Sequence, residues 1–247
     1  MTGQAALTGR TALVTGASRG IGRGIAVALA GAGAAVAVNY RSRADEAAAT
    51  VAEIERAGGR AVPVRADVAI RAEVEALTER VGSALGPIDV LVNNAGIATI
   101  RGLDDLTEED FDATLATNLK SAFLCIQAVI PGMRRRGWGR IVNISSVAAR
   151  GAGGVGVHYN ASKAGLEGLT RGYAARLAPE GITVNAVAPG LIDTEMAAPL
   201  KASGVVDRLP VGRIGTPDEI AQAVLMVTGN AFLTGQTIAV NGGGSFL

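Results

Sequence analysis

Residues 11–22 read TALVTGASRGIG, and this stretch decides how the rest of the chain is interpreted. Its first half is a short apolar and β-branched run, which is typical of a buried strand. The glycines that follow, Gly16, Gly20 and Gly22, permit a sharp turn and a close approach of the backbone to a ligand. A helix is expected to begin at Gly20, where free N–H groups and the helix dipole suit a pyrophosphate. This order predicts a dinucleotide-binding site, although the spacing differs from the common Gly-x-Gly-x-x-Gly fingerprint.

The same loop also matches the nucleophile elbow of a hydrolase, because residues 16–20 spell Gly-x-Ser-x-Gly. That chemistry needs a histidine base. The sole histidine of the chain, His158, has no acid placed as an obvious partner. The hydrolase is therefore the disfavoured alternative.

Short β-branched runs alternate with longer helical stretches along the whole chain. Strands are predicted at residues 11–15, 35–39, 61–65, 89–93, 140–145, 183–188 and 237–240. Helices are predicted at residues 20–32, 44–57, 70–85, 108–135, 157–178 and 217–227, the last with Thr216 as its N-cap. This alternation predicts an α/β fold with a doubly wound parallel sheet of about seven strands and helices on both faces. Residues 1–247 are expected to form one domain, with a substrate lid at about 190–215.

The composition excludes several classes of protein. The 247 residues include 23 basic and 22 acidic ones, a net charge of +1, which argues against a nucleic-acid partner and against a basic membrane-binding surface. A single cysteine, Cys125, excludes an internal disulfide and a cysteine-clustered metal site, and no metal is expected. The longest apolar run, residues 25–38, is too short to cross a membrane, and residues 1–10 lack a signal-peptide pattern. We therefore expect a cytoplasmic protein.

The residues after the second strand indicate which dinucleotide is bound. An NAD-dependent enzyme carries an acid about 20 residues after the loop, where it holds the ribose 2′-hydroxyl. Here residues 39–43 read NYRSR, with no acid and with two arginines, Arg41 and Arg43. Guanidinium groups pair well with a phosphate, and Arg19 is a third cation nearby. The pattern predicts NADP(H), with NAD(H) as the second choice; the alternative is an ordinary solvated loop.

Two further segments would line the path of the cofactor. Asp67 and Val68 follow the third strand, where a carboxylate could accept a hydrogen bond from an adenine amino group. Residues 93–96, Asn-Asn-Ala-Gly, end the fourth strand and leave room for a ligand. Each segment could equally be a plain turn.

The strongest chemical signal is the pair Tyr159 and Lys163. Residues four apart share one face of a helix, about 6 Å apart at Cβ. A free tyrosine has a pKa near 10, and a neighbouring ammonium would lower that pKa and make proton transfer feasible. Upstream, Ser145 and Ser146 lie at the end of the fifth strand, where a hydroxyl would open at the sheet edge at which ligands bind in such folds. Asn118 lies in a long apolar helix, either as a satisfied structural group or as one that bends the helix and holds a water.

Together these motifs resemble the short-chain dehydrogenase/reductase family, and most of all its 3-oxoacyl-(acyl-carrier-protein) reductases. The resemblance extends over essentially the whole chain, in order and at family spacing. It rests on residues 15–22, 93–96, Asn118, Ser146, Tyr159, Lys163, 185–190 and 240–243. It implies a single Rossmann-type domain and an oxidoreductase acting on CH–OH and C=O groups.

The resemblance also implies a role for each site residue. Tyr159 would give its proton to the substrate carbonyl oxygen, which Ser146 would hydrogen-bond. Lys163 would lower the tyrosine pKa and hold the nicotinamide ribose, and Asn118 would anchor a water that links the lysine to solvent. The cofactor would contact Gly16, Ser18, Arg19, Gly20, Ile21, Gly22, Tyr40, Arg41, Ser42, Asp67, Val68, Asn94, Ala95, Gly96, Tyr159, Lys163, Pro189, Gly190, Ile192 and Thr194. The family is commonly a homotetramer, built through helices 108–135 and 157–178 and the last strand.

The expected activity is NADPH-dependent reduction of a 3-oxoacyl thioester or a similar β-keto substrate. The alternatives are an NAD(P)-dependent dehydrogenase of a sugar, polyol or small cyclic alcohol, and a non-catalytic NADP-sensing module. Two positions at which the acyl-carrier reductases place basic residues are Glu180 and Gly137 here, which makes an acyl-carrier protein a weaker candidate partner. The segment 190–212 is also about three residues shorter than in those reductases, which favours a smaller or different ketone.

Overall fold

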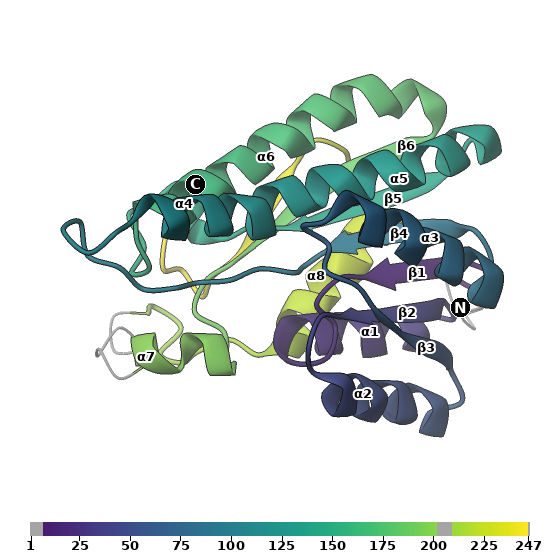
Figure 1. The fold of residues 1–247 in the computed structure, drawn as a ribbon, viewed down its shortest axis with the longest axis horizontal. Helices are drawn as coiled ribbons and strands as arrows, with labels where there is room; N and C mark the ends of the chain where they lie inside the picture. The colour runs from purple at the N-terminus through teal and green to yellow at the C-terminus, as the bar shows by residue number, and fades with distance from the viewer. Residues whose placement is uncertain (1–6, 202–208, 247) are drawn as a thin grey trace.

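The computed structural model describes residues 7–201 and 209–246. Within them, seven strands form one parallel sheet in the order β3-β2-β1-β4-β5-β6-β7. The direction of winding therefore reverses between β1 and β4 (Figure 1). The strands are β1 Thr11–Val14, β2 Ala35–Tyr40, β3 Arg60–Arg65, β4 Ile88–Asn93, β5 Gly139–Ile144, β6 Ile182–Pro189 and β7 Thr237–Val240. The predicted doubly wound parallel sheet is confirmed.

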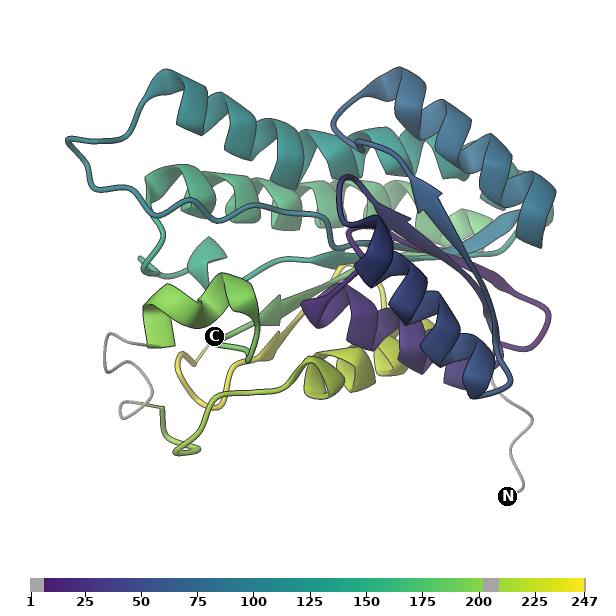
Figure 2. The same ribbon diagram turned by 60° about the horizontal axis from the view of Figure 1, so that its bottom comes forward.

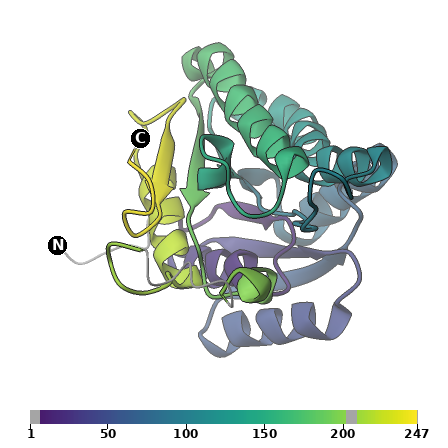
Figure 3. The same ribbon diagram turned by 90° about the vertical axis from the view of Figure 1, so that its left-hand side faces the viewer.

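Helices cover both faces of this sheet, because its inner strands are buried on both sides. The main helices are α1 Gly20–Gly31, α2 Ala44–Arg56, α3 Arg71–Leu85, α4 Glu108–Leu115, α5 Ser121–Arg136, α6 Val157–Leu177, α7 Ala198–Lys201 and α8 Pro217–Gly229. Of these, α1, α2 and α8 pack on one face and α3, α5 and α6 on the other, each group with its own apolar core (Figures 1 and 3). Outside the long helix and the lid, the predicted ends agree with the observed ones within two residues.

The predicted helix 108–135 is interrupted. A π-helical turn, η1 Ala116–Lys120, lies between α4 and α5. Asn118 is buried within it, and its carboxamide bonds to the backbone of Ile97, with Oδ1 accepting from N at 2.8 Å and Nδ2 donating to O at 3.0 Å. Such single-turn π segments frequently occur at functional sites. The helix is thus distorted at Asn118, and the Asn118 side chain is also hydrogen-bonded. The structure therefore shows a feature of each of the two interpretations of this residue.

The combined helix Glu108–Arg136 corrects one expectation about apolar runs. By length and composition this helix could cross a membrane. From the sequence, only the shorter apolar run at 25–38 is considered as a candidate membrane span. Half of the most apolar window of the helix is nevertheless buried inside the protein. Leu124, Ile126 and Met133 from this helix lie in the core beneath the sheet, as in the interior helix of a folded domain.

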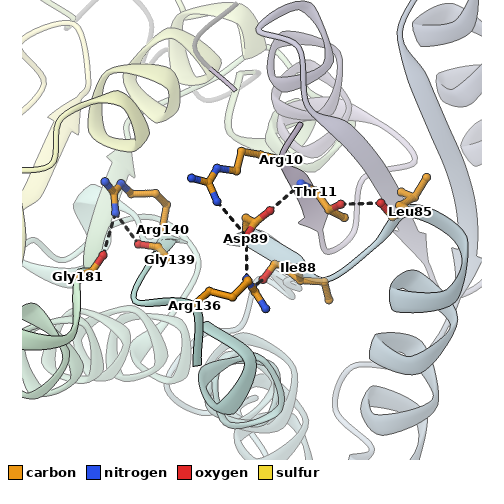
Figure 4. Close-up of polar contacts among 9 residues, drawn as sticks. All are labelled: Arg10, Thr11, Leu85, Ile88, Asp89, Arg136, Gly139, Arg140 and Gly181. Atoms are coloured by element: carbon orange, nitrogen blue, oxygen red, sulfur yellow. Dashed lines mark hydrogen bonds and ion pairs between the residues drawn. The ribbon is translucent and has the colours of Figure 1, made fainter. Parts of the chain in front are cut away.

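Charged residues close the amino-terminal ends of the strands (Figure 4). The buried carboxylate of Asp89 accepts from the backbone N of Thr11 at 3.2 Å and pairs with Arg10 and Arg136 at 3.4 and 3.2 Å. Arg140 donates to the carbonyls of Gly139, Gly181 and Thr228, and its guanidinium lies over the ring of Trp138, as does that of Arg10. These bonds fix the base of the sheet and leave its carboxyl edge for a ligand site.

Of the predicted lid at 190–215, residues 202–208 lie outside the described residues. It contains a short 3₁₀ turn, η4 Glu195–Ala197, followed by α7. Its two ends are tied together, because Asp193 N donates to Gly215 O at 2.8 Å and Gly215 N donates to Leu191 O at 3.0 Å. The segment thus leaves and rejoins the fold at one place beyond β6 (Figure 2).

Candidate active site

A cleft of about 1310 Å³ opens at the carboxyl edge of the sheet. The turns after β1, β4, β5 and β6 all contribute to it, as expected at the point where the winding reverses. Every residue predicted to contact the cofactor lines this cleft, and so does Ser146. Asn118 does not line it but lies behind, against Ile97.

The glycine-rich loop is held open by hydrogen bonds from two asparagines. Gly16 has a positive φ of 60°, and its N–H donates to Asn39 Oδ1 at 3.2 Å. Asn94 Nδ2 donates to the carbonyls of Thr15 and Gly16 at 2.9 and 3.0 Å. A Cβ on Gly22 would overlap Gly16 O and the Asn94 side chain. In the sequence, Asn39 stands out only because no acid is present at the end of the second strand. In the structure, Asn39 and Asn94 both shape the glycine-rich loop.

The three predicted arginines border the cleft, and each already has an acidic partner. Arg41 Nη1 lies 3.7 Å from Asp67 Oδ2, and Arg43 Nη1 lies 2.6 Å from Glu46 Oε1. Arg19 Nε lies 3.9 Å from the other oxygen of Glu46. The positive surface expected from the sequence is thus balanced by carboxylates that sequence spacing did not connect with it.

The catalytic candidates come from the end of β5 and the first turns of α6. Ser146 lies beside the phenol of Tyr159, close enough for its hydroxyl to lower the pKa of that phenol. Lys163 is buried, and its ammonium donates to the carbonyl of Ile144 at 2.8 Å. Its Nζ lies 5.6 Å from the centre of the Tyr159 ring. The structure therefore brings Ser146, Tyr159 and Lys163 together in one corner of the cleft.

The electrostatics of this corner differ from the expectation that Lys163 lowers the tyrosine pKa. Burial raises the pKa of the Tyr159 phenol above its usual value of 10, and the neighbouring Ser146 hydroxyl lowers that pKa only in part. Burial also lowers the pKa of Lys163 to about 8. The Lys163 ammonium is directed at Ile144 O, so it interacts mainly with a backbone carbonyl and not with the phenol. The phenol stays protonated at neutral pH, which suits a proton donor.

Asn118 acts on this corner indirectly. Its Nδ2 donates to Ser162 Oγ at 3.1 Å, and Ser162 Oγ donates to the carbonyl of Tyr159 at 2.8 Å. The side chain therefore joins the Ile97 segment to the helix that carries the tyrosine. The water that the resemblance implies stays a prediction.

A second layer of residues, missed in the sequence, ties the Ser146 turn to α6. The carboxylate of Glu167 is buried one turn beyond Lys163, with Oε1 3.4 Å from Ser145 Oγ and Oε2 2.9 Å from Arg150 Nε. Arg150 follows the short 3₁₀ turn, η2 Val147–Ala149, that begins directly after Ser146. The sequence gives only a weak signal for this buried ion pair, because a glutamate at this helix position is usually interpreted as a solvent-exposed charge.

We expect Arg150→Met to lower kcat about tenfold while the NADPH dissociation constant stays within twofold. The reason is that an unpaired buried carboxylate would loosen the turn that positions Ser146. Steady-state kinetics and a fluorescence titration with NADPH measure the two quantities. Arg150→Lys should restore most of the rate, and Arg176→Met, an arginine whose Nη1 bonds to the Gly172 carbonyl of its own helix, is the control. An unchanged kcat in Arg150→Met would show that the ion pair does not position the serine.

His158 has a different place from the one a hydrolase needs. It is fully buried, and its Nε2 lies 3.0 Å from the carbonyl of Thr99. Ser18 of the Gly-x-Ser-x-Gly motif lines the cleft, whereas His158 does not. The geometry therefore does not pair the serine of that motif with a histidine base.

Comparisons with known proteins agree with this geometry. A family model described as short chain dehydrogenase matches residues 10–203. The 3-oxoacyl-(acyl-carrier-protein) reductase of Synechocystis sp. is 44% identical over 96% of this chain and 98% of its own. The reductase of the same name from Staphylococcus aureus is 44% identical, covering 95% of this chain and 97% of its own.

Solved structures show the same similarity. A putative gluconate dehydrogenase from Agrobacterium tumefaciens superposes with a TM-score of 0.92 at 36% identity and covers 98% of both chains. A blue fluorescent protein from a metagenomic library, in complex with NADPH, gives a TM-score of 0.91 at 42% identity, over 98% of this chain and 100% of its own. Both structures cover nearly the whole chain.

Proposed function

Because the chain belongs to the short-chain dehydrogenase family, we propose that it is an NADPH-dependent carbonyl reductase acting on a 3-oxoacyl thioester or a similar β-keto substrate. The observation that carries the proposal is the arrangement of Ser146, Tyr159 and Lys163 in one corner of the cleft. The names of the relatives support the substrate class, and the neighbour solved with NADPH supports the cofactor.

The residues of the cleft fit the cofactor. A Cβ on Gly22 would overlap Gly16 O, so glycine at this position lets the loop pack tightly against the start of α1, whose free N–H groups suit a pyrophosphate. Arg41 and Arg43 line the same cleft and suit a 2′-phosphate. When bound, the reduced nicotinamide supplies a hydride. Tyr159 donates its phenolic proton to the substrate carbonyl oxygen, so that hydride and proton together yield an alcohol. Ser146 donates a hydrogen bond to the same oxygen and stabilises its developing charge.

The lining near Tyr159 favours an acyl substrate over a sugar. Sugars and sugar acids need several polar groups for their hydroxyls, whereas a fatty acyl chain gains from apolar surface. The described part of the chain lines the cleft with many apolar side chains, several of them from the lid itself. They are Ile97, Ala98, Val147, Ala148, Val155, Leu191, Met196, Ala197 and Leu209.

A series of 3-oxoacyl-CoA thioesters tests this proposal. We expect NADPH oxidation with acetoacetyl-CoA and a kcat/KM that rises up to about fourfold per added methylene, since burial of a methylene contributes about 0.8 kcal/mol, until the cleft is filled. D-gluconate and a cyclic alcohol with NADP⁺ are the matched comparison. Turnover of these alcohols alone would favour the sugar or cyclic-alcohol dehydrogenase. Binding of NADPH without turnover of any substrate would favour the non-catalytic module.

The form of the thioester and the assembly belong to the same proposal. Glu180 occupies one position expected to be basic, and its carboxylate pairs with Arg134 at 2.8 Å, which removes positive charge from that surface. A small thioester is therefore preferred over an acyl-carrier protein as the direct substrate. A groove of about 590 Å³ between α4, α5 and α6, with Phe123 and Leu169 in its lining, supports the homotetramer contact expected along these helices.

A further inference from the structure

The lid contributes a carboxylate to the arginines at the adenosine end of the cleft. Glu195, the first residue of η4, forms an ion pair with Arg19 and lies 3.7 Å from Nη2 of Arg43. Arg19 belongs to the glycine loop and Arg43 caps α2, so one lid residue bridges the turns after β1 and β2. All three residues line the cleft.

A second carboxylate pairs with the same two arginines. Glu46, in the first turn of α2, lies 2.6 Å from Arg43 and 3.9 Å from Arg19. The cluster therefore contains two positive and two negative side chains, and its formal charge is zero. Glu46 is fixed on a helix with 36% of its side chain exposed, whereas Glu195 is 65% exposed on the lid. Glu195 is the partner that can leave.

We propose that Glu195 is a specificity-determining residue that competes with the 2′-phosphate of NADPH for Arg19 and Arg43. This inference rests on the proposed function, because it assumes that the arginines bind NADPH. A phosphate monoester carries a charge between −1 and −2 near neutral pH, and a neutral cluster offers it no net attraction. Departure of Glu195 leaves the cluster with a charge of +1. The 2′-hydroxyl of NADH has no charge to exchange and leaves Glu195 in place.

The competition links cofactor choice to the lid. A phosphate that replaces the carboxylate frees η4 and α7 from the two arginines, whereas NADH leaves the lid tethered over the adenosine end. The free energy needed to displace Glu195 weakens the binding of NADPH but not that of NADH. Removing the charge of Glu195 should consequently increase the selectivity for NADPH over NADH.

Equilibrium titration of Glu195→Gln tests the proposal without reference to turnover. The probes are NADPH, NADH and adenosine 2′,5′-bisphosphate, which carries the 2′-phosphate but no nicotinamide. We expect NADPH and the bisphosphate to bind about three- to tenfold tighter than to the wild type, in the range of a partly exposed ion pair and the repulsion it relieves. NADH should stay within twofold, and the gain should shrink at high salt.

Glu180→Gln is the matched control, because it removes an equally simple ion pair, with Arg134, away from the cleft. Equal tightening for NADH and NADPH, or unchanged binding of the bisphosphate, would overturn the competition. Wild-type protein that binds NADH as tightly as NADPH would overturn the preference for NADPH under the proposed function, and this inference with it. Failure of the proposed NADPH preference is seen with the wild type, before any variant is made. It is therefore distinguishable from failure of the competition by Glu195, which only the variant reveals.

Discussion

Tyr159→Phe is expected to lower kcat for reduction of acetoacetyl-CoA by about 10²- to 10⁴-fold, the contribution of a positioned general acid. The variant keeps the ring and loses only the phenolic hydroxyl, whose proton we place on the carbonyl oxygen. Ser146, which lies beside that phenol, remains to bind the oxygen but has no comparable proton to give. NADPH oxidation followed under saturating substrate measures the loss.

The same variant should leave cofactor binding nearly unchanged, with an NADPH dissociation constant within about twofold of the wild type. Tyr173→Phe is a control on the same helix, because its hydroxyl accepts a hydrogen bond from Gln127 at 2.6 Å and is not part of the cleft. Turnover retained in Tyr159→Phe would remove the tyrosine from the role of proton donor. Equal losses in both variants would indicate a general disturbance of α6.

The protonation state of the phenol is where sequence reasoning went furthest from the structure. The spacing of Tyr159 and Lys163 correctly predicted that they share a corner, but not the direction of the ammonium. That direction depends on the carbonyl of Ile144, which lies in a strand far from α6 in sequence. With burial raising the tyrosine pKa, the site as built is suited to giving a proton to a ketone, in agreement with a reductase.

The fold was more predictable than the site because its signals are local. Strands buried on both faces, glycines at the loop after β1 and the capping box of Thr216 and Glu219 are each visible within a few residues. The π turn at Asn118 depends instead on a bond to Ile97, 21 residues away. No window of sequence shows such a contact.

The same limit applies to charge. Glu167 was overlooked and the arginines were taken as unpaired, because most of the partners that decide their state come from other elements, although Glu46 lies only three residues after Arg43. Arg41 meets Asp67 across two strand ends, and Arg43 meets Glu195 across the cleft. A single sequence identifies which charges exist near a motif, whereas the structure shows which of them remain to act on a ligand.

Arg41→Ala combined with Arg43→Ala is expected to raise the NADPH dissociation constant about 10²-fold and to change that of NADH less than threefold. Each arginine would lose a charge-assisted hydrogen bond to the 2′-phosphate, worth about tenfold at a partly exposed site. Arg56→Ala, in the last turn of α2, is the control for removing a positive charge nearby. Equal losses for both cofactors would show that the arginines support the loop but do not read the phosphate. A loss confined to NADPH would also define the role of Glu195, because only arginines that bind the phosphate give its carboxylate something to compete for.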